Sequence, residues 1–450
     1  MIGLNKIGLN QVLLNRLRLN APFPAYGKMA GGGGSGDGFP QLPGDVTRWH
    51  FGGLTNEMMA AMDDPRIEDA DHKGRFLSFK NFAWKEGSGI SDIYPGALVF
   101  DGVDDRGVCE NFPILTKEKG YTVVVLRQWD QDFLNTTLTG GLLSTRNYST
   151  GEGVAFEKIE SSNKGYWNLG AGGFIDFAKS PFTWQTSKQY NNVGILKGDK
   201  NHGKPLCVGC GLSGGQQCGR FAIWELVFLD HDATEEELTK IKDYFVKTYP
   251  WLFPDQAWTV VGKTNEDEDR ATIANITGNG NDLVCLNLGF IEGSGYNEEG
   301  EYAGYLVTDG VDDKITSSTF EMGNDWTVIG DWELINTGKN DNAGIVKFDS
   351  IVIYNYNPIL INIKNGRNNL IPDQNTVNAI CSDGRIYSKD WKESIYNEET
   401  ESTSKNLLTI GYSGNSYTKI AFKNLAIYPT VLSKEDCIKA YNYLQTLKAK

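Results

Sequence analysis

The sequence lacks the long apolar run that a membrane-spanning helix requires. No segment approaches the ~18 uninterrupted apolar residues of such a helix. Basic charge is also scarce: 43 Lys and Arg residues stand against 57 Asp and Glu residues, which gives a net charge of −14. An acidic protein offers no electrostatic footprint to nucleic acid or to an anionic membrane. We therefore expect no nucleic-acid partner and no membrane insertion.

A secretory signal is missing as well. Asparagines at a regular spacing interrupt each apolar stretch before it reaches the roughly 7–15 residues of a signal-peptide core. Without an export signal, we expect a protein made in the cytoplasm with reduced thiols. The cysteines are odd in number and scattered, and the seven are Cys109, Cys207, Cys210, Cys218, Cys285, Cys381 and Cys437.

Proline is scarce, at 14 of 450 residues, whereas glycine is frequent, at 52. Many turns and few prolines favour short β-strands over helices. The length is about three times that of a typical domain of roughly 150 residues, so we expect two or three domains.

The N-terminal residues 2–20 repeat with a period of five. A leucine precedes an asparagine in each repeat, at Leu4, Leu9, Leu14 and Leu19. This period fits neither a helix nor a flat strand, because the leucines would rotate off any single face. The repeat could instead suit one coil of a square β-solenoid, which would need partners to stack on. The alternative is that residues 2–20 form a disordered tail. We favour an assembly anchor over residues 1–30, followed by a glycine-rich linker over residues 31–44.

The rest of the chain is an internal duplication. The sequence Asp-Gly-Val-Asp-Asp at 101–105 recurs at 309–313, and Glu-Gly-Ser-Gly at 86–89 recurs at 292–295. Residues 221–228 align with residues 420–427 without a gap. The nearly constant spacing between paired blocks predicts two copies of one domain, over residues 45–255 and 256–450.

Each copy is rich in short runs of β-branched and aromatic residues, separated by Gly, Asn and Asp, which is typical of strands. Each copy ends in a helix signal. Thr234 and Glu237 form a capping box ahead of an amphipathic stretch, and Ser433 begins the same pattern in the second copy. The fold class is therefore predicted to be all-β, as two tandem antiparallel jelly-roll sandwiches that each close with a short helix.

These features resemble the concanavalin A-like lectin/glucanase superfamily, in its laminin-G-like branch. The resemblance rests on Phe100 to Asp104, on a middle strand that opens Tyr/Trp-Thr-Val, and on the ending Ile-x-Glu-Leu-x-Phe before a helix. The second copy departs from the pattern at Thr308 and Asn424. The resemblance implies carbohydrate or protein recognition, and some members bind calcium at a sandwich edge.

The order of motifs from Asn81 to Asp105 also looks like tandem proteins encoded by phages of Bacteroides-type gut bacteria. An asparagine-punctuated segment ahead of such modules resembles the anchors of virion fibres and decoration proteins. This resemblance implies localisation in a virion, other virion structural proteins as partners through the N-terminal segment, and a homo-oligomer.

Motifs for catalysis are weak. The superfamily's glucanases carry a Glu-x-Asp-x-x-Glu run that places two carboxylates on one strand face, and none is present; Glu266 to Asp269 is the nearest and is interpreted as a solvated turn. Cys207, Cys210 and Cys218, with His202, permit a zinc site, but structural cysteines are favoured. We predict no catalytic residues and a protein that is not an enzyme.

The two repeated aspartate segments are the best candidates for metal chemistry. Their carboxylates are hard oxygen ligands of the kind that calcium prefers; they are Asp101, Asp104, Asp105, Asp309, Asp312 and Asp313. Asp before Gly is equally ordinary turn chemistry, and this structural interpretation is favoured. No other cofactor is predicted.

Sugar binding requires exposed aromatic rings, because the apolar face of a pyranose stacks on a ring. The eligible tryptophans are Trp129, Trp167, Trp184, Trp332 and Trp391, although each also suits a core. We predict a virion-associated structural protein that displays two lectin-like modules for weak, multivalent binding of glycans or a host surface. The alternatives are a purely structural decoration protein without a ligand, and a glycan hydrolase with an unrecognised site.

Overall fold

The structure is a computed structural model that describes residues 38–113, 121–134, 136–145, 205–212, 216–335, 377–395, 406–413 and 416–449, together with the backbone of the strands between residues 155 and 197 and between 343 and 371. Within this part of the chain, no helix is long and apolar enough to cross a membrane. The anchor leucines Leu4, Leu9, Leu14 and Leu19 lie outside the described residues.

The first half of the chain folds into a sandwich of facing sheets. The sheet that faces the second half contains β12 (Val193–Lys197), β7 (Thr122–Trp129), β16 (Arg220–Leu229), β5 (Leu98–Asp101) and β4 (Gly89–Ile90) in that order, with β1 (Val46–His50) also on β16. The opposite sheet contains β11 (Gly173–Phe174), β10 (Gly165–Asn168), β9 (Ala155–Lys158), β8 (Gly140–Ser144), β13 (Leu206–Val208), β6 (Arg106–Cys109), β3 (Phe76–Lys80) and β2 (Arg66–Glu68), with the hairpin β14 (Cys210–Leu212) and β15 (Gln216–Cys218) beside β8.

The second half repeats this plan. One sheet contains β20 (Gly295–Tyr296), β21 (Leu306–Val307), β34 (Ile420–Tyr428), β23 (Thr327–Leu334), β28 (Val377–Cys381), β29 (Arg385–Ser388) and β30 (Glu393–Ile395), with β17 (Gln256–Thr259) on β34. The other contains β18 (Thr272–Ile273), β19 (Leu283–Leu286), β22 (Lys314–Phe320), β31 (Asn406–Ile410), β24 (Ala343–Phe348), β25 (Ile351–Asn355), β26 (Ile359–Ile363) and β27 (Arg367–Ile371); β32 (Tyr412–Ser413) and β33 (Ser416–Tyr417) form a separate hairpin.

Strand β7 illustrates why the sheets pack on both faces. Its side chains alternate, so Val123 and Val125 point into the core of the first sandwich while Val124 and Leu126 point to the outer face. All four are buried. A run that is apolar at every position needs cover on both sides, and helix α4 (Glu235–Thr248) together with the second half of the chain provides that cover. The prediction of an all-β fold built from antiparallel sandwiches is confirmed.

Short helices complete each half: α2 (Asn56–Ala60), α3 (Gln131–Leu134), α4 (Glu235–Thr248), the 3-10 turn η2 (Pro250–Leu252) and α5 (Lys434–Leu444). The Thr234 side chain caps α4, and Glu237 closes a reciprocal capping box as predicted. Ser433 caps α5 in the same way, by accepting from the Asp436 amide.

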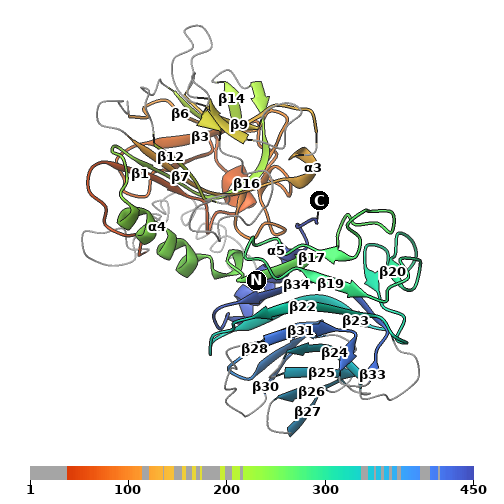
Figure 1. Cartoon of the computed structure of the whole chain (residues 1–450). Coiled ribbons are helices and arrows are strands. Elements are labelled where there is room, and N and C mark those ends of the chain that lie inside the picture. The colour runs from red at the N-terminus through yellow and green to blue at the C-terminus, as the bar shows by residue number, and fades with distance from the viewer. Residues whose placement is uncertain are drawn as a thin grey trace, which may run out of the picture.

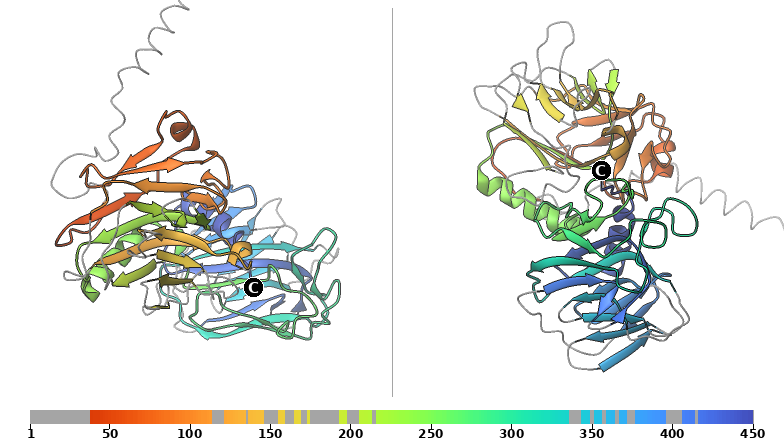
Figure 2. Two further views of the ribbon diagram at one scale, coloured as in Figure 1. Left: turned by 90° about the horizontal axis from the view of Figure 1, so that it is seen from above. Right: turned by 45° about the vertical axis from the view of Figure 1, so that its right-hand side comes forward.

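The two sandwiches share a core at their junction. Figures 1 and 2 show the halves as separate bodies with α4 and α5 between them. Buried side chains from the outer faces of β7 and β16, from α4 and η2, and from the outer faces of β23 and β34 and α5 form one continuous cluster. Tyr443 of α5 packs edge-on against Trp224 at 6.0 Å between ring centroids and donates a hydrogen bond to Gln128 Oε1 at 3.0 Å. The second half is thus packed against the first.

Candidate binding site

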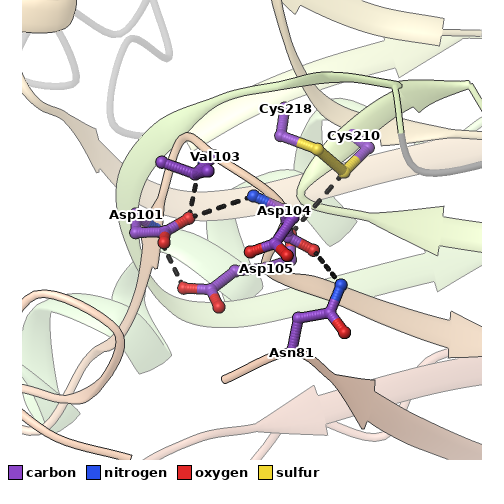
Figure 3. Close-up of a disulfide and its surroundings, with 7 residues drawn as sticks. All are labelled: Asn81, Asp101, Val103, Asp104, Asp105, Cys210 and Cys218. Atoms are coloured by element: carbon purple, nitrogen blue, oxygen red, sulfur yellow. Dashed lines mark hydrogen bonds between the residues drawn. A yellow bond between two sulfur atoms is a disulfide. The ribbon is translucent and has the colours of Figure 1, made fainter. Parts of the chain in front are cut away.

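The first repeated aspartate segment forms a tight loop after β5 (Figure 3). Asp101 Oδ1 accepts hydrogen bonds from the Val103 amide at 2.7 Å and the Asp104 amide at 3.3 Å. Asp105 Oδ2 accepts from the Asp101 amide at 3.0 Å, and Asp105 Oδ1 accepts from Ser88 Oγ at 3.0 Å. The loop is therefore held by its own carboxylates.

The second segment repeats this geometry nearly bond for bond. Asp309 Oδ1 accepts from the Val311 and Asp312 amides at 2.7 and 3.3 Å. Asp313 Oδ2 accepts from the Asp309 amide at 2.8 Å and from Ser294 Oγ at 2.7 Å. The duplication thus extends to individual hydrogen bonds.

Each loop gathers three carboxylates whose oxygens lie within 4.8 Å of one another. The gathering follows from the turn, since the inner carboxylates accept from backbone and serine donors of the same loop. Burial raises the pKa of Asp105 to about 7 and also raises the pKa of Asp313. Both oxygens of the Asp105 carboxyl group accept hydrogen bonds from within the protein. These hydrogen bonds are those of an aspartate turn, and calcium binding at the two loops stays a prediction.

The candidate tryptophans separate by burial. Trp129 and Trp332 are each 2% exposed and belong to the cores of the first and second sandwich. Their prediction as sugar platforms is wrong, because their strand positions point inward. Trp391 is partly exposed and has a positive φ of 56°. Trp167 lies in β10, but its side chain is outside the described residues, as is all of Trp184.

The cysteines correct a second expectation. Cys210 and Cys218 are cross-strand partners in the β14–β15 hairpin and form a disulfide, so the expectation of reduced thiols is wrong for this pair. Cys207 packs beside them as a buried free thiol. Because two of the three sulfurs are bonded to each other, the trio is not a zinc site as it stands; His202 lies outside the described residues.

A different cluster emerges when the outer faces of the two aligned sheets are compared. In the first sandwich, the outer face carries Trp224, Leu126 and Gln128, all buried in or beside the shared core. The strand register places Lys423, Asp331 and Glu333 at the corresponding positions of the second sandwich. These three are only partly buried. At these three positions the face is uncharged and buried in the first copy, and charged and partly exposed in the second, whereas the rest of both faces contributes to the shared core.

We name this surface the open face and define it by Tyr302, Tyr305, Asp331, Glu333, Lys423 and Tyr441. Asp331 is its centre: Tyr305 donates a hydrogen bond to Asp331 Oδ1 at 3.0 Å, and the Asp331 charge also acts on the Tyr441 hydroxyl. The Lys423 ammonium lies 3.8 Å from Asp331 Oδ2 and 5.5 Å from the Tyr305 ring centroid. Burial, and then the nearby Asp331 charge, raise the pKa of both Tyr305 and Tyr441, so both hydroxyls remain donors.

Aromatic rings border this centre on two sides. The Tyr302 and Tyr305 rings meet edge to face, with centroids 6.4 Å apart. On the other side, the Trp391 ring packs edge-on against Tyr441 at 5.7 Å. Trp391 is therefore the one described candidate tryptophan that borders the open face. Reasoning from the sequence missed the tyrosines. The aligned pair Trp224 and Lys423 was a visible signal, since an aromatic residue in one copy is replaced by a charged residue at the same position of the other.

The chain is similar in structure to known proteins, but it matches no protein-family model, and the comparison with curated proteins finds no relative. Among solved structures, the chain is similar to the receptor-binding domain of botulinum neurotoxin type G, with 12% identity, a TM-score of 0.27, 42% of this chain covered and 50% of that domain. The chain thus spans half the length of that domain.

Two further solved structures contain sialic acid. One is a Trypanosoma rangeli sialidase in complex with sialic acid, at 8% identity and a TM-score of 0.30, over 84% of this chain and 67% of the sialidase. The other is the ligand-binding domain of botulinum neurotoxin serotype D with N-acetylneuraminic acid, at 9% identity and a TM-score of 0.30, over 78% and 94%.

The prediction that the protein is not an enzyme is wrong as a categorical statement, because sialidases are among the matched structures. At TM-scores of about 0.3 these matches carry no residue or activity over to this chain.

Proposed function

We propose that the protein binds glycans, and that the open face of the second sandwich is its binding surface. One observation carries the proposal: three partly exposed tyrosines, from the loop before β21 and from α5, accompany two carboxylates of β23 whose aligned residues in the first sandwich are buried. Sugar rings stack on aromatic side chains while their hydroxyls bond to carboxylates and phenols. A surface with this composition is suited to a saccharide.

The finer parts of the proposal rest on the sequence. The tandem sandwiches resemble the laminin-G-like branch, and the five-residue repeat of residues 2–20 resembles a virion anchor. We include in the proposal that residues 1–30 attach the protein to other structural proteins of a phage particle and that several copies act together. Display in many copies raises the avidity of a weak saccharide site. Co-purification with virions, lost on deletion of residues 1–30 while both sandwiches stay folded, is the expected result.

A glycan array probed with a multivalent form of the full chain tests the binding function. We expect binding that falls at least about tenfold for Tyr305→Ala, in the range typical of losing one stacking and hydrogen-bonding aromatic. Phe76→Ala is the matched control, because Phe76 is an exposed aromatic (37%) of the first sandwich, outside the open face. Silence across the array at high valency would favour a purely structural decoration protein.

A further inference from the structure

The open face carries more negative charge than its cation balances. Asp331 is the carboxylate that Lys423 approaches. Glu333, two residues along β23, and Glu301, next to Tyr302, have no ion-pair partner within the described part of the chain. Burial raises the pKa of Tyr302, and the charges of Glu301 and Glu333 act in the same direction. Both glutamates therefore act electrostatically on the tyrosine pair.

The charge of the ligand follows from this imbalance. We infer that the open face binds a saccharide that bears a free amine, such as a glucosamine oligomer. An ammonium group near Glu301 and Glu333 gains a Coulomb attraction, whereas the carboxylate of an acidic sugar is repelled by the same groups. The net charge of −14 adds to this discrimination at long range. The inference rests on the proposed function and adds the class of sugar.

Each group on the face has a separate role in this arrangement. The partly exposed Tyr302 and Tyr305 rings provide the stacking surface. Asp331, held by the Tyr305 hydroxyl, accepts from sugar hydroxyls on its remaining lone pairs. Glu333 selects for charge, and the duplication supplies its neutral equivalent, because Gln128 occupies the aligned position in the first sandwich. Glu333→Gln thus replaces the charge with the side chain that the other copy carries.

Titration calorimetry on the full chain tests the inference with three probes: a glucosamine oligomer, its N-acetylated form of equal length, and sialyllactose. At low salt we expect the glucosamine oligomer to bind about tenfold more tightly than the N-acetylated one, and sialyllactose to bind most weakly. High salt should reduce this difference in affinity, because salt screens charges such as those of the partly exposed glutamates. Glu333→Gln should reduce it about threefold and leave the N-acetylated probe unchanged. The control is Glu236→Gln, which lies on the exposed surface of α4 and should leave the affinities for all three probes unchanged.

This experiment distinguishes failure of the amine inference from failure of the proposed glycan-binding function. Equal affinity for the amine and acetylated probes, tightest binding of sialyllactose, or saccharide binding that survives both Tyr305→Ala and Glu333→Gln would each overturn the inference while glycan binding stands. Absence of binding to every saccharide tested would overturn the proposed function together with it.

Discussion

The outer faces of the two sandwiches differ in burial and in charge at aligned positions. In the first sandwich, Trp224 and Leu126 are buried against α5 of its neighbour. In the second, Lys423 and Asp331 stand at the aligned positions and remain partly exposed. Both sheets contribute to the shared core, but at these aligned positions the first is apolar and buried while the second is charged and partly exposed. Position in the tandem, rather than the fold, distinguishes the two copies.

Truncating the aligned residues Trp224 and Lys423 to alanine gives the largest expected difference in stability between the two copies. Trp224→Ala should lower the free energy of unfolding by about 4 kcal/mol, because it opens a cavity in the shared core. Lys423→Ala should change it by less than about 0.5 kcal/mol, as is usual for a partly exposed surface residue. Urea denaturation followed by tryptophan fluorescence and circular dichroism measures both. Similar small effects for the two variants would show that the first sandwich does not depend on its neighbour for cover.

A buried ionic network gives the second contrast. Glu225 accepts from Tyr244 at 3.1 Å and from Tyr249 at 2.8 Å, lies 2.7 Å from His50 Nδ1, and pairs with Arg48 at 3.4 Å. Glu225→Gln should cost about 3 kcal/mol, since it leaves the buried Arg48 without its counter-charge.

The aligned residue in the second sandwich is Asn424, and neither polar atom of its amide has a hydrogen-bond partner in the described part of the structure. Asn424→Ala should therefore change stability by less than about 1 kcal/mol, because the removed polar group was unsatisfied. Chemical denaturation of the two variants measures the difference. A large loss for Asn424→Ala would reveal a partner for this amide.

The fold was predictable because patterns that are ambiguous in one copy of the domain recur at the aligned positions of the other. The aspartate loops, the capping signals at Thr234 and Ser433, and the aligned final strands are all local patterns, and all form the predicted structures. Burial of an individual ring depends on which strand face turns inward and on what covers it. Trp129 and Trp332 therefore looked eligible from the sequence although both are in cores, and Tyr305 and Tyr441 went unnoticed because their meeting at Asp331 joins residues more than 100 apart in sequence.

The hairpin beside each aspartate loop offers a third contrast. Cys210 and Cys218 are joined in the first sandwich, whereas Tyr412 and Tyr417 pair across the corresponding strands of the second, with ring centroids 4.8 Å apart. Replacing both cysteines with serine should lower the free energy of unfolding by about 2.5 kcal/mol, because the unfolded chain regains the entropy that the short disulfide-closed loop removes. Tyr417→Ala should cost about 1 kcal/mol.

Denaturation with and without reductant measures the disulfide's contribution. The reductant should shift the midpoint of the wild-type protein but not that of the double serine variant. A wild-type midpoint that is insensitive to reductant, with seven reactive thiols in the unfolded chain, would contradict the disulfide.

An effect that depends on pH concerns the buried carboxyl group of the first aspartate loop. Burial raises the pKa of Asp105 from 3.8 to about 7 in the folded protein. Between pH 4 and pH 7 the unfolded chain releases this proton first, so the folded state holds more protons and the free energy of unfolding falls as pH rises. The fall should amount to about 2 kcal/mol, and Asp105→Asn should remove it. The pKa of Asp313 is raised in the same direction, so Asp313→Asn should flatten the pH profile with the same sign. Urea midpoints measured across this pH range test both loops, and a variant that keeps the wild-type slope would show that its aspartate is ionised in the folded protein as it is in the unfolded chain.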